Sequence, residues 1–216
     1  MDEILALFDD KKAEIEMLRK QVHDFFELDE RLNQAPFPIV HSVKSRVKNR
    51  DHLKEKIERK GDITTDNFFE KITDLAGVRV LHLYQDQFKV IHEVIMEKIE
   101  EKHDWVLGET PKAYTWDPES KQFFEELGLE VEQKESFYTS IHYLVKPHEL
   151  FPFYCEIQVR TLFEEIWGEI DHKINYPTPT TNVACKEQIR VLAKLVGAGS
   201  RLADSIFRSY DEDHEE

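Results

Sequence analysis

A carboxylate and an arginine frame the segment Asp-Leu-Ala-Gly-Val-Arg at positions 74–79. Asp74 stands directly before an apolar run, and Arg79 lies within that run. An arginine in a core strand is costly unless a phosphate, a carboxylate or a flat ring pairs with it. The glycine between them lets the backbone approach a ligand closely. These residue types indicate a binding site for a charged or planar group.

A second carboxylate occurs in the alternating segment Glu-Ile-Gln-Val-Arg at 156–160. The period of a strand places Glu156, Gln158 and Arg160 on one face and the two aliphatic residues on the other. Such a strand could simply be half exposed to solvent. Beside a second carboxylate such as Asp74, however, Glu156 becomes a candidate Mg²⁺ ligand, because Mg²⁺ is usually held by one or two carboxylates and the phosphates of a substrate.

An aromatic segment, Tyr-Thr-Ser-Ile-His-Tyr at 138–143, offers groups that suit a nucleoside. Alternation places Tyr138, Ser140 and His142 on one side of a strand, with a ring to stack on a base and polar groups for ribose or phosphate. An ordinary aromatic-rich strand is the alternative interpretation.

Basic residues are concentrated between His41 and Lys60, where eight lysines and arginines stand against three acidic residues. The whole chain has a formal net charge of −15, which argues against broad binding of nucleic acid. A local basic block in an acidic protein suits a phosphate-binding face. A solvated helix face with balancing ion pairs is the alternative.

The elements that must position these residues alternate between helices and strands. The expected helices cover 2–32, a segment capped by Asn49 or Asp51 and ended by Gly61, a segment capped by Asp86, 161–175 and 184–209. The expected strands cover 39–47, 77–84, 105–107, 138–146 and 153–160. The stretch 108–136 is expected to be mostly loop, with a short helix around 123–124, and 211–216 to be an acidic tail.

This order predicts an α/β (α+β) fold, with a mixed β-sheet packed with helices and flanked by N- and C-terminal helices. The 216 residues suffice for one domain, which we divide into an N-terminal helix (1–35), a core (36–178) and a C-terminal helix with its tail (179–216). The apolar stripes of the terminal helices suggest a homo-oligomer. No run is long enough to span a membrane. Cys155 and Cys185 are expected to be unpaired and buried, which predicts a cytoplasmic protein.

Taken together and in this order, the segments resemble the RelA/SpoT family of (p)ppGpp synthetases, in particular its small single-domain members. The resemblance extends from about Ser45 to Tyr176. Ordered motifs at these spacings are far more specific than a lone glycine-rich loop. The resemblance implies a nucleotidyltransferase-like fold and a GTP pyrophosphokinase, an enzyme that uses Mg²⁺ and transfers pyrophosphate from ATP to the ribose 3′-hydroxyl of GDP or GTP.

The resemblance also implies a role for each matching residue on the donor side. Asp74 and Glu156 would be the catalytic carboxylates and metal ligands, with Glu156 helping to deprotonate the acceptor hydroxyl. Two arginines would sandwich the adenine of ATP, and three basic residues would hold its phosphates. These are Arg46 and Arg79 for the ring, and Lys48, Lys56 and Arg59 for the phosphates.

On the acceptor side, the resemblance implies that Tyr138 stacks on the base and that His142 contacts phosphate or ribose, with Gln158 and Arg160 nearby. Departures from the family fall in this half. Phe137 occupies the place of a family glycine, and Thr139 replaces a residue that is commonly basic. The sequence therefore leaves two alternatives for the acceptor. One is GDP or GTP, and the other, as in toxin-like members, is the 3′ end of tRNA or an adenosine nucleotide.

Two further considerations bear on these alternatives. A non-enzymatic nucleotide-binding module is disfavoured, because Asp74, Glu156 and the basic block are all present. A carboxylate among Glu130, Glu132 and Glu135 could accept from guanine N1–H and its 2-amino group, whereas adenine offers no such donor pair. The same acidity would repel a tRNA backbone, so guanine is the expected acceptor base.

Overall fold

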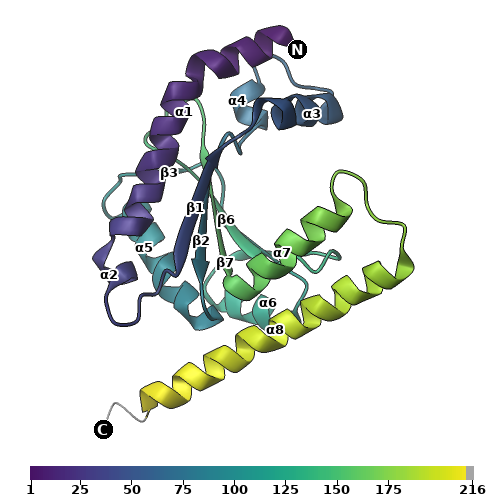
Figure 1. The fold of residues 1–216 in the computed structure, drawn as a ribbon. Coiled ribbons are helices and arrows are strands. Elements are labelled where there is room, and N and C mark those ends of the chain that lie inside the picture. Colours follow the sequence, from purple (N-terminus) through teal and green to yellow (C-terminus); the bar gives the residue numbers. More distant parts are fainter. Residues whose placement is uncertain (213–216) are drawn as a thin grey trace.

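The computed structural model describes residues 1–212, and these form a mixed sheet with helices on both faces (Figure 1). The strand order is β1-β2-β7-β6-β4-β5, with β3 paired to β6 beside this path. Strand β7 is parallel to β2 and antiparallel to β6. The strands are β1 (Ser42–Val47), β2 (Ala76–His82), β3 (Val106–Leu107), β4 (Lys112–Thr115), β5 (Glu130–Gln133), β6 (Ser140–Lys146) and β7 (Cys155–Thr161).

The helices divide between the two faces of the sheet. Helix α1 lies along one side and α7 along the other, with the long α8 crossing beneath α7 (Figure 1). The helices are α1 (Asp2–Leu28), α2 (Glu30–Asn33), α3 (Arg50–Lys60), α4 (Phe68–Lys71), α5 (Phe88–Glu100), α6 (Pro118–Glu126), α7 (Leu162–Asn175) and α8 (Val183–Glu212), with a 3-10 turn η1 (Gln85–Gln87) before α5. None of the helices in residues 1–212 is long and apolar enough to cross a membrane.

The main core lies between the sheet and the helices α1 and α5. Helix α1 buries an apolar stripe that includes Phe8, Leu18 and Phe26 against inward-facing strand residues such as Val80 and Ile157. Burial of this stripe removes a large apolar area from water, which is the main favourable term in folding. The N-terminal helix therefore covers the sheet.

The opposite face of the sheet is polar, and this face carries the candidate site. Strand pairing aligns one polar residue from each of five neighbouring strands: Lys44, Arg79, Gln158, His142 and Lys112. Alternation places aliphatic residues on the core side of the same strands. Helix α7 packs over the β2 and β7 part of this polar face.

Local signals in the sequence agree well with the ends of several elements. Asn49 caps α3 by accepting from the Asp51 and His52 amides, and Gly61 ends it in the left-handed region, at φ 74°. Thr161 caps α7 in a reciprocal capping box with Glu164. The predicted fold class and the alternation of β7 are confirmed.

Several sequence predictions are wrong. The stretch 108–136 contains β4, α6 and β5 rather than being mostly loop. Asp86 lies in η1 and does not cap α5; its carboxylate pairs with Lys89 and Arg208. The first helix breaks at Asp29, whose side chain caps α2 instead.

Three smaller differences concern the second half of the chain. Strand β6 begins at Ser140, so Tyr138 precedes it. Cys155 is buried as expected, but Cys185 is only half-buried; both thiols are free. The expected acidic tail 211–216 is helical in its first two residues, which complete α8, and its last four lie outside the described residues.

Helix α8 has an apolar contact on one side and an open stripe on another. Ile189, Ala193 and Val196 form a second small core with Trp167 of α7, against which Phe137 and Tyr138 pack. The exposed large apolar side chains of α8 include Val191, Leu195, Leu202 and Ile206.

Candidate active site

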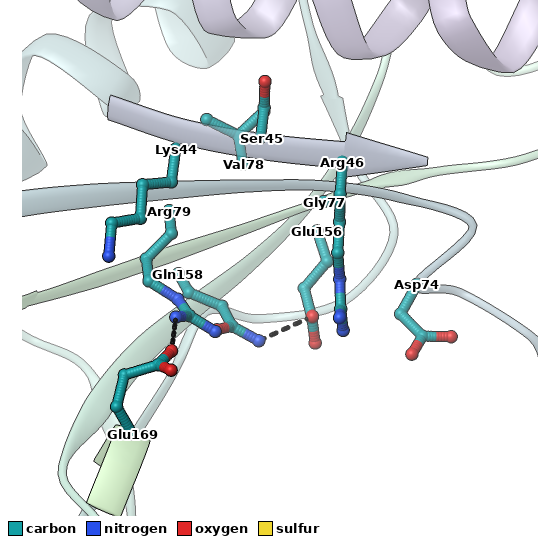
Figure 2. A pocket seen from close by; sticks show the side chains of 10 residues that line it. All are labelled: Lys44, Ser45, Arg46, Asp74, Gly77, Val78, Arg79, Glu156, Gln158 and Glu169. Atoms are coloured by element: carbon teal, nitrogen blue, oxygen red, sulfur yellow. Dashed lines mark hydrogen bonds and ion pairs between the residues drawn. The ribbon is translucent and has the colours of Figure 1, made fainter. Parts of the chain in front are cut away.

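A cavity of about 250 Å³ opens on the polar face of the sheet, between β1, β2, β7 and α7 (Figure 2). The side chains of Arg46, Arg79, Glu156 and Gln158 extend from the sheet on the same side, with Asp74 and Glu169 at opposite ends of the view. The lining residues are Lys44, Ser45, Arg46, Asp74, Gly77, Val78, Arg79, Glu156, Gln158 and Glu169.

Asp74 is held by two lysines at one end of this cavity. Lys48 Nζ donates to Oδ2 at 2.6 Å, and Lys56 Nζ donates to Oδ1 at 2.8 Å. Burial raises the pKa of the Asp74 carboxyl, but the two ammonium groups outweigh this effect and hold the pKa below its usual value. Asp74 is therefore an ionised carboxylate whose two oxygens are both occupied by cations.

Glu156 lies in β7, directly across from Gly77 of β2. Its carboxylate accepts a hydrogen bond from Gln158 Nε2 at 2.8 Å and lies 3.3 Å from His142 Nδ1. Burial raises the pKa of Glu156, yet the hydrogen bond and charge of His142 bring it below the usual value, while the charge of Asp74 opposes them. The charge of Asp74 thus acts on Glu156, and both carboxylates line the same cavity.

The two arginines expected around adenine reach the cavity from neighbouring strands. Arg46 is paired with Gly77 across β1 and β2, and Arg79 lies two positions further along β2. A Cβ atom at Gly77 would meet only the carbonyl oxygen of Arg46, at 4.0 Å, so this position borders open space. Arg46 and Arg79 line the cavity. Arg59, by contrast, is exposed on α3, and its side chain makes no hydrogen bond or ion pair within residues 1–212.

The residues expected on the acceptor side form a chain of contacts that ends on Glu156. Tyr138 Oη lies 3.0 Å from His142 Nε2, and His142 joins Glu156 through its other ring nitrogen. Arg160 Nη2 donates to Gln158 Oε1 at 3.1 Å, and its guanidinium lies 5.5 Å from the centre of the Tyr138 ring. The structure thus brings Tyr138, His142, Gln158 and Arg160 together beside Glu156.

Phe137 has the backbone conformation that glycine favours. Its φ is 60°, in the left-handed region that costs an L-residue about 1–2 kcal/mol. Its ring lies 5.0 Å from the ring of Trp116 and packs against the small core around Trp167. Ring packing therefore accompanies a backbone conformation that glycine would adopt without strain.

The three glutamates expected near the acceptor base do not reach the cavity. Glu130 and Glu132 belong to β5 at the far edge of the sheet, separated from β6 by β4. Glu132 forms an ion pair with Lys134, and Lys134 lies over the ring of Tyr114. Glu135 is exposed in the turn before Tyr138.

Sequence reasoning missed three residues around the cavity, namely Lys44, Glu165 and Glu169. Lys44 and Arg79 are neighbours across β1 and β2, and both donate to Glu165 of α7. Glu169 lies one helical turn further on and pairs with Arg79 at 3.2 Å. The i, i+4 spacing of the two glutamates was the available signal, because it puts both on one helix face.

The carboxylates present fit a magnesium ion bound together with a substrate. No group of three or more His, Cys, Asp and Glu side chains suited to a metal occurs in the part of the chain that the structure describes. Asp74 and Glu156 nevertheless line one cavity. Mg²⁺ usually needs only one or two carboxylates, because phosphate oxygens and waters complete its octahedron. These two residues would hold it once phosphates draw Lys48 and Lys56 away.

A mixed sheet whose polar face joins two carboxylates to several lysines and arginines is suited to binding a phosphorylated ligand together with a metal ion. A family model described as "Region found in RelA / SpoT proteins" matches residues 45–181, more than half of the chain. The chain belongs to the RelA/SpoT family.

Two relatives from Bacillus subtilis (strain 168) are similar over most of the chain. GTP pyrophosphokinase YwaC is 26% identical over 189 residues, covering 82% of this chain and 80% of the relative. GTP pyrophosphokinase YjbM is 25% identical over 180 residues, covering 77% and 70%.

Solved structures show the same fold. The small alarmone synthetase 1 of B. subtilis superimposes with a TM-score of 0.69 at 22% identity and covers all of both chains. The same protein bound to its product pppGpp also gives a TM-score of 0.69, at 20% identity, covering 98% of this chain and 100% of that one. The predicted mixed β-sheet with flanking helices is confirmed.

Proposed function

We propose that this protein is a GTP pyrophosphokinase, which transfers the β,γ-pyrophosphate of ATP to the ribose 3′-hydroxyl of GDP or GTP and releases AMP. The observation that carries this proposal is the shared cavity of Asp74, Glu156, Arg46 and Arg79, with Lys48 and Lys56 bound to Asp74. The names of YwaC and YjbM support the same activity.

We expect the donor nucleotide, ATP, to bind in the cavity in one orientation. Lysines at the Asp74 end would take the phosphates, and a guanidinium plane at Arg46 and at Arg79 would lie on the adenine faces. Arg59 lies on the exposed side of α3 and would reach the outermost phosphate. Bound Mg²⁺ would neutralise phosphate charge between Asp74 and Glu156.

The chemical step needs alignment and charge neutralisation more than covalent help from the protein. The acceptor 3′-oxygen forms a bond to the β-phosphorus of ATP while the bond from that phosphorus to the α,β-bridging oxygen breaks. The bridging oxygen leaves on AMP, and the proton of the 3′-hydroxyl passes to the Glu156 carboxylate. Tyr138 would stack on the acceptor base, with His142, Gln158 and Arg160 on its ribose and phosphates.

We infer a cytoplasmic setting from the two free cysteines, and self-association through α8 from its exposed apolar stripe. The terminal helix α1 buries its main apolar stripe against the sheet. The interface in this proposal is therefore α8 alone.

The decisive experiment incubates the protein with γ-labelled ATP and Mg²⁺, adding GDP, GTP, an adenosine nucleotide or tRNA in separate reactions. The label should move to the guanine nucleotide, and Asp74→Asn should remove the transfer. Strong labelling of tRNA or of the adenosine nucleotide, with little on GDP and GTP, would show that the acceptor is not a guanine nucleotide. The assignment of the donor site would be unaffected. No labelled product with any acceptor would favour a nucleotide-binding module.

A further inference from the structure

Glu165 of α7 pairs with three cationic side chains, one from each of three adjacent strands. Lys44 Nζ of β1 lies 2.9 Å from Oε1, Arg79 Nη1 of β2 lies 2.9 and 3.0 Å from the two oxygens, and Arg160 Nε of β7 lies 3.3 Å from Oε2. The Glu165 side chain is only 5% exposed. A carboxylate this deep is stable as an anion only with such partners.

The charge state of Glu165 agrees with this arrangement. Burial raises the pKa of its carboxyl, but the hydrogen bond from Lys44 and the charges of Arg160 and Arg79 bring it below the usual value. Glu165 is thus a buried anion that the reaction proposed above does not use.

Two of the three cations, Arg79 and Arg160, would contact different substrates in the proposed reaction. Arg79 lines the cavity on the donor side, whereas Arg160 contacts Gln158 and the Tyr138 ring on the acceptor side. Gln158 in turn donates to Glu156. A continuous set of contacts therefore passes from Arg79 through Glu165 and Arg160 to the carboxylate at the reaction centre.

We propose that Glu165 is a positioning residue that fixes the donor-side Arg79 and the acceptor-side Arg160 relative to each other, so that both nucleotides are aligned by one buried anion. This inference rests on the proposed function. The capping box of Thr161 and Glu164 fixes the first turn of α7, so Glu165 is held over the strands by the helix that follows β7.

Glu169 provides a matched comparison on the same helix. It lies one turn beyond Glu165, pairs with Arg79 at 3.2 Å and has no bond to Arg160 or Lys44. Its side chain is 54% exposed. Glu165→Gln and Glu169→Gln therefore make the same chemical change at two sites, of which only the first touches both halves of the cavity.

The test measures the KM for ATP and the KM for GDP in the pyrophosphate-transfer reaction for wild type, Glu165→Gln and Glu169→Gln. Glu165→Gln should raise both KM values by about tenfold or more, because Arg79 and Arg160 lose a buried counter-charge. Glu169→Gln should change only the KM for ATP, and by a factor of about three or less, because its ion pair with Arg79 is exposed to solvent. Glu165→Asp, which keeps the charge, should recover part of the loss in both values.

Calorimetric titration of GDP and of a non-hydrolysable ATP analogue gives a second readout that needs no turnover. If wild type transfers no label to any acceptor, the proposed function fails, while weakened binding of both nucleotides to Glu165→Gln would still support the positioning role. A Glu165→Gln protein with a lower melting temperature but unchanged binding and KM values would show that Glu165 is only structural. If Glu165→Gln does not fold, Glu165→Asp provides the test. The inference is overturned if Glu165→Asp changes the affinity for only one nucleotide or for neither. It is also overturned if the wild type binds neither nucleotide.

Discussion

At the scale of single residues, Asp74 shows how two lysines compensate the charge of a carboxylate before a substrate binds. Each of its oxygens accepts from one lysine, at 2.6 and 2.8 Å. The phosphates of ATP carry several negative charges, so they compete with a single carboxylate for such ammonium groups. Binding of ATP would therefore move the lysines to phosphate and free Asp74 for the metal.

This exchange leads to a prediction about the two carboxylates. Asp74→Asn and Glu156→Gln should each lower turnover by at least about 100-fold, as the loss of a key electrostatic group does in other enzymes. The fold should survive, because both substitutions keep the shape of the side chain and neither residue belongs to the apolar core. Turnover at saturating ATP and thermal unfolding measure the two effects. Near-native turnover in either variant would show that the carboxylate has another role.

A second prediction concerns Tyr138. Tyr138→Ala should weaken acceptor binding roughly ten- to hundredfold, since stacking of a base on an aromatic ring is worth about 1–3 kcal/mol. Tyr138→Phe keeps the ring and loses only the bond to His142, so we expect a reduction of a few fold. The KM for GDP in each variant gives the answer. Equal losses in both variants would mean that the hydroxyl group, and not the ring, carries the interaction.

At the scale of elements, the sequence predicts best where the signal is local. The caps of α3 at Asn49 and Gly61 need only the chemistry of neighbouring residues, and both are as expected. Strands β4 and β5 were missed because each has four residues and β5 is a largely exposed, acidic edge strand. Glu165 was missed for a different reason: two of its three cationic partners, Arg79 and Lys44, are 86 and 121 residues away along the chain.

The first turn of α7 leads to a pH prediction. Glu164 accepts from the Thr161 amide, and burial raises the pKa of its carboxyl to about 7. Between the unfolded pKa of about 4.5 and about 7, the folded protein keeps a proton that the unfolded chain releases. Stability from this group is therefore full below the unfolded pKa and declines as pH rises through 7.

Glu164→Gln is neutral at every pH and keeps an oxygen for the capping box. Relative to wild type, this variant should gain stability by roughly 1–3 kcal/mol between pH 4.5 and 7.5, by the linkage of protonation to folding. Urea unfolding of both proteins across this range tests the prediction. Parallel pH profiles would mean that Glu164 titrates normally in the folded state.

At the scale of the whole molecule, α8 is the element with most apolar surface left open. Val191, Leu195, Leu202 and Ile206 are each more than half exposed. We expect sedimentation at micromolar concentration to show a dimer or larger species, and Leu195→Glu with Leu202→Glu to dissociate it. Leu150→Glu, at an isolated leucine that is 91% exposed, is the control. A wild type that sediments as a monomer would contradict self-association through α8.

The position of β7 in the sheet has a consequence for how the protein is made. Among residues 1–212 it is the last strand along the chain, yet it lies between β2 and β6 near the middle of the sheet. Until β7 joins, β2 and β6 each present an unpaired edge, which invites association with other chains. Glu156, Arg160 and Glu165 arrive together with β7 and the turn of α7 that follows it. A growing chain on the ribosome therefore completes its sheet and its nucleotide cavity in one late event, and it cannot consume ATP before the fold that controls the reaction exists.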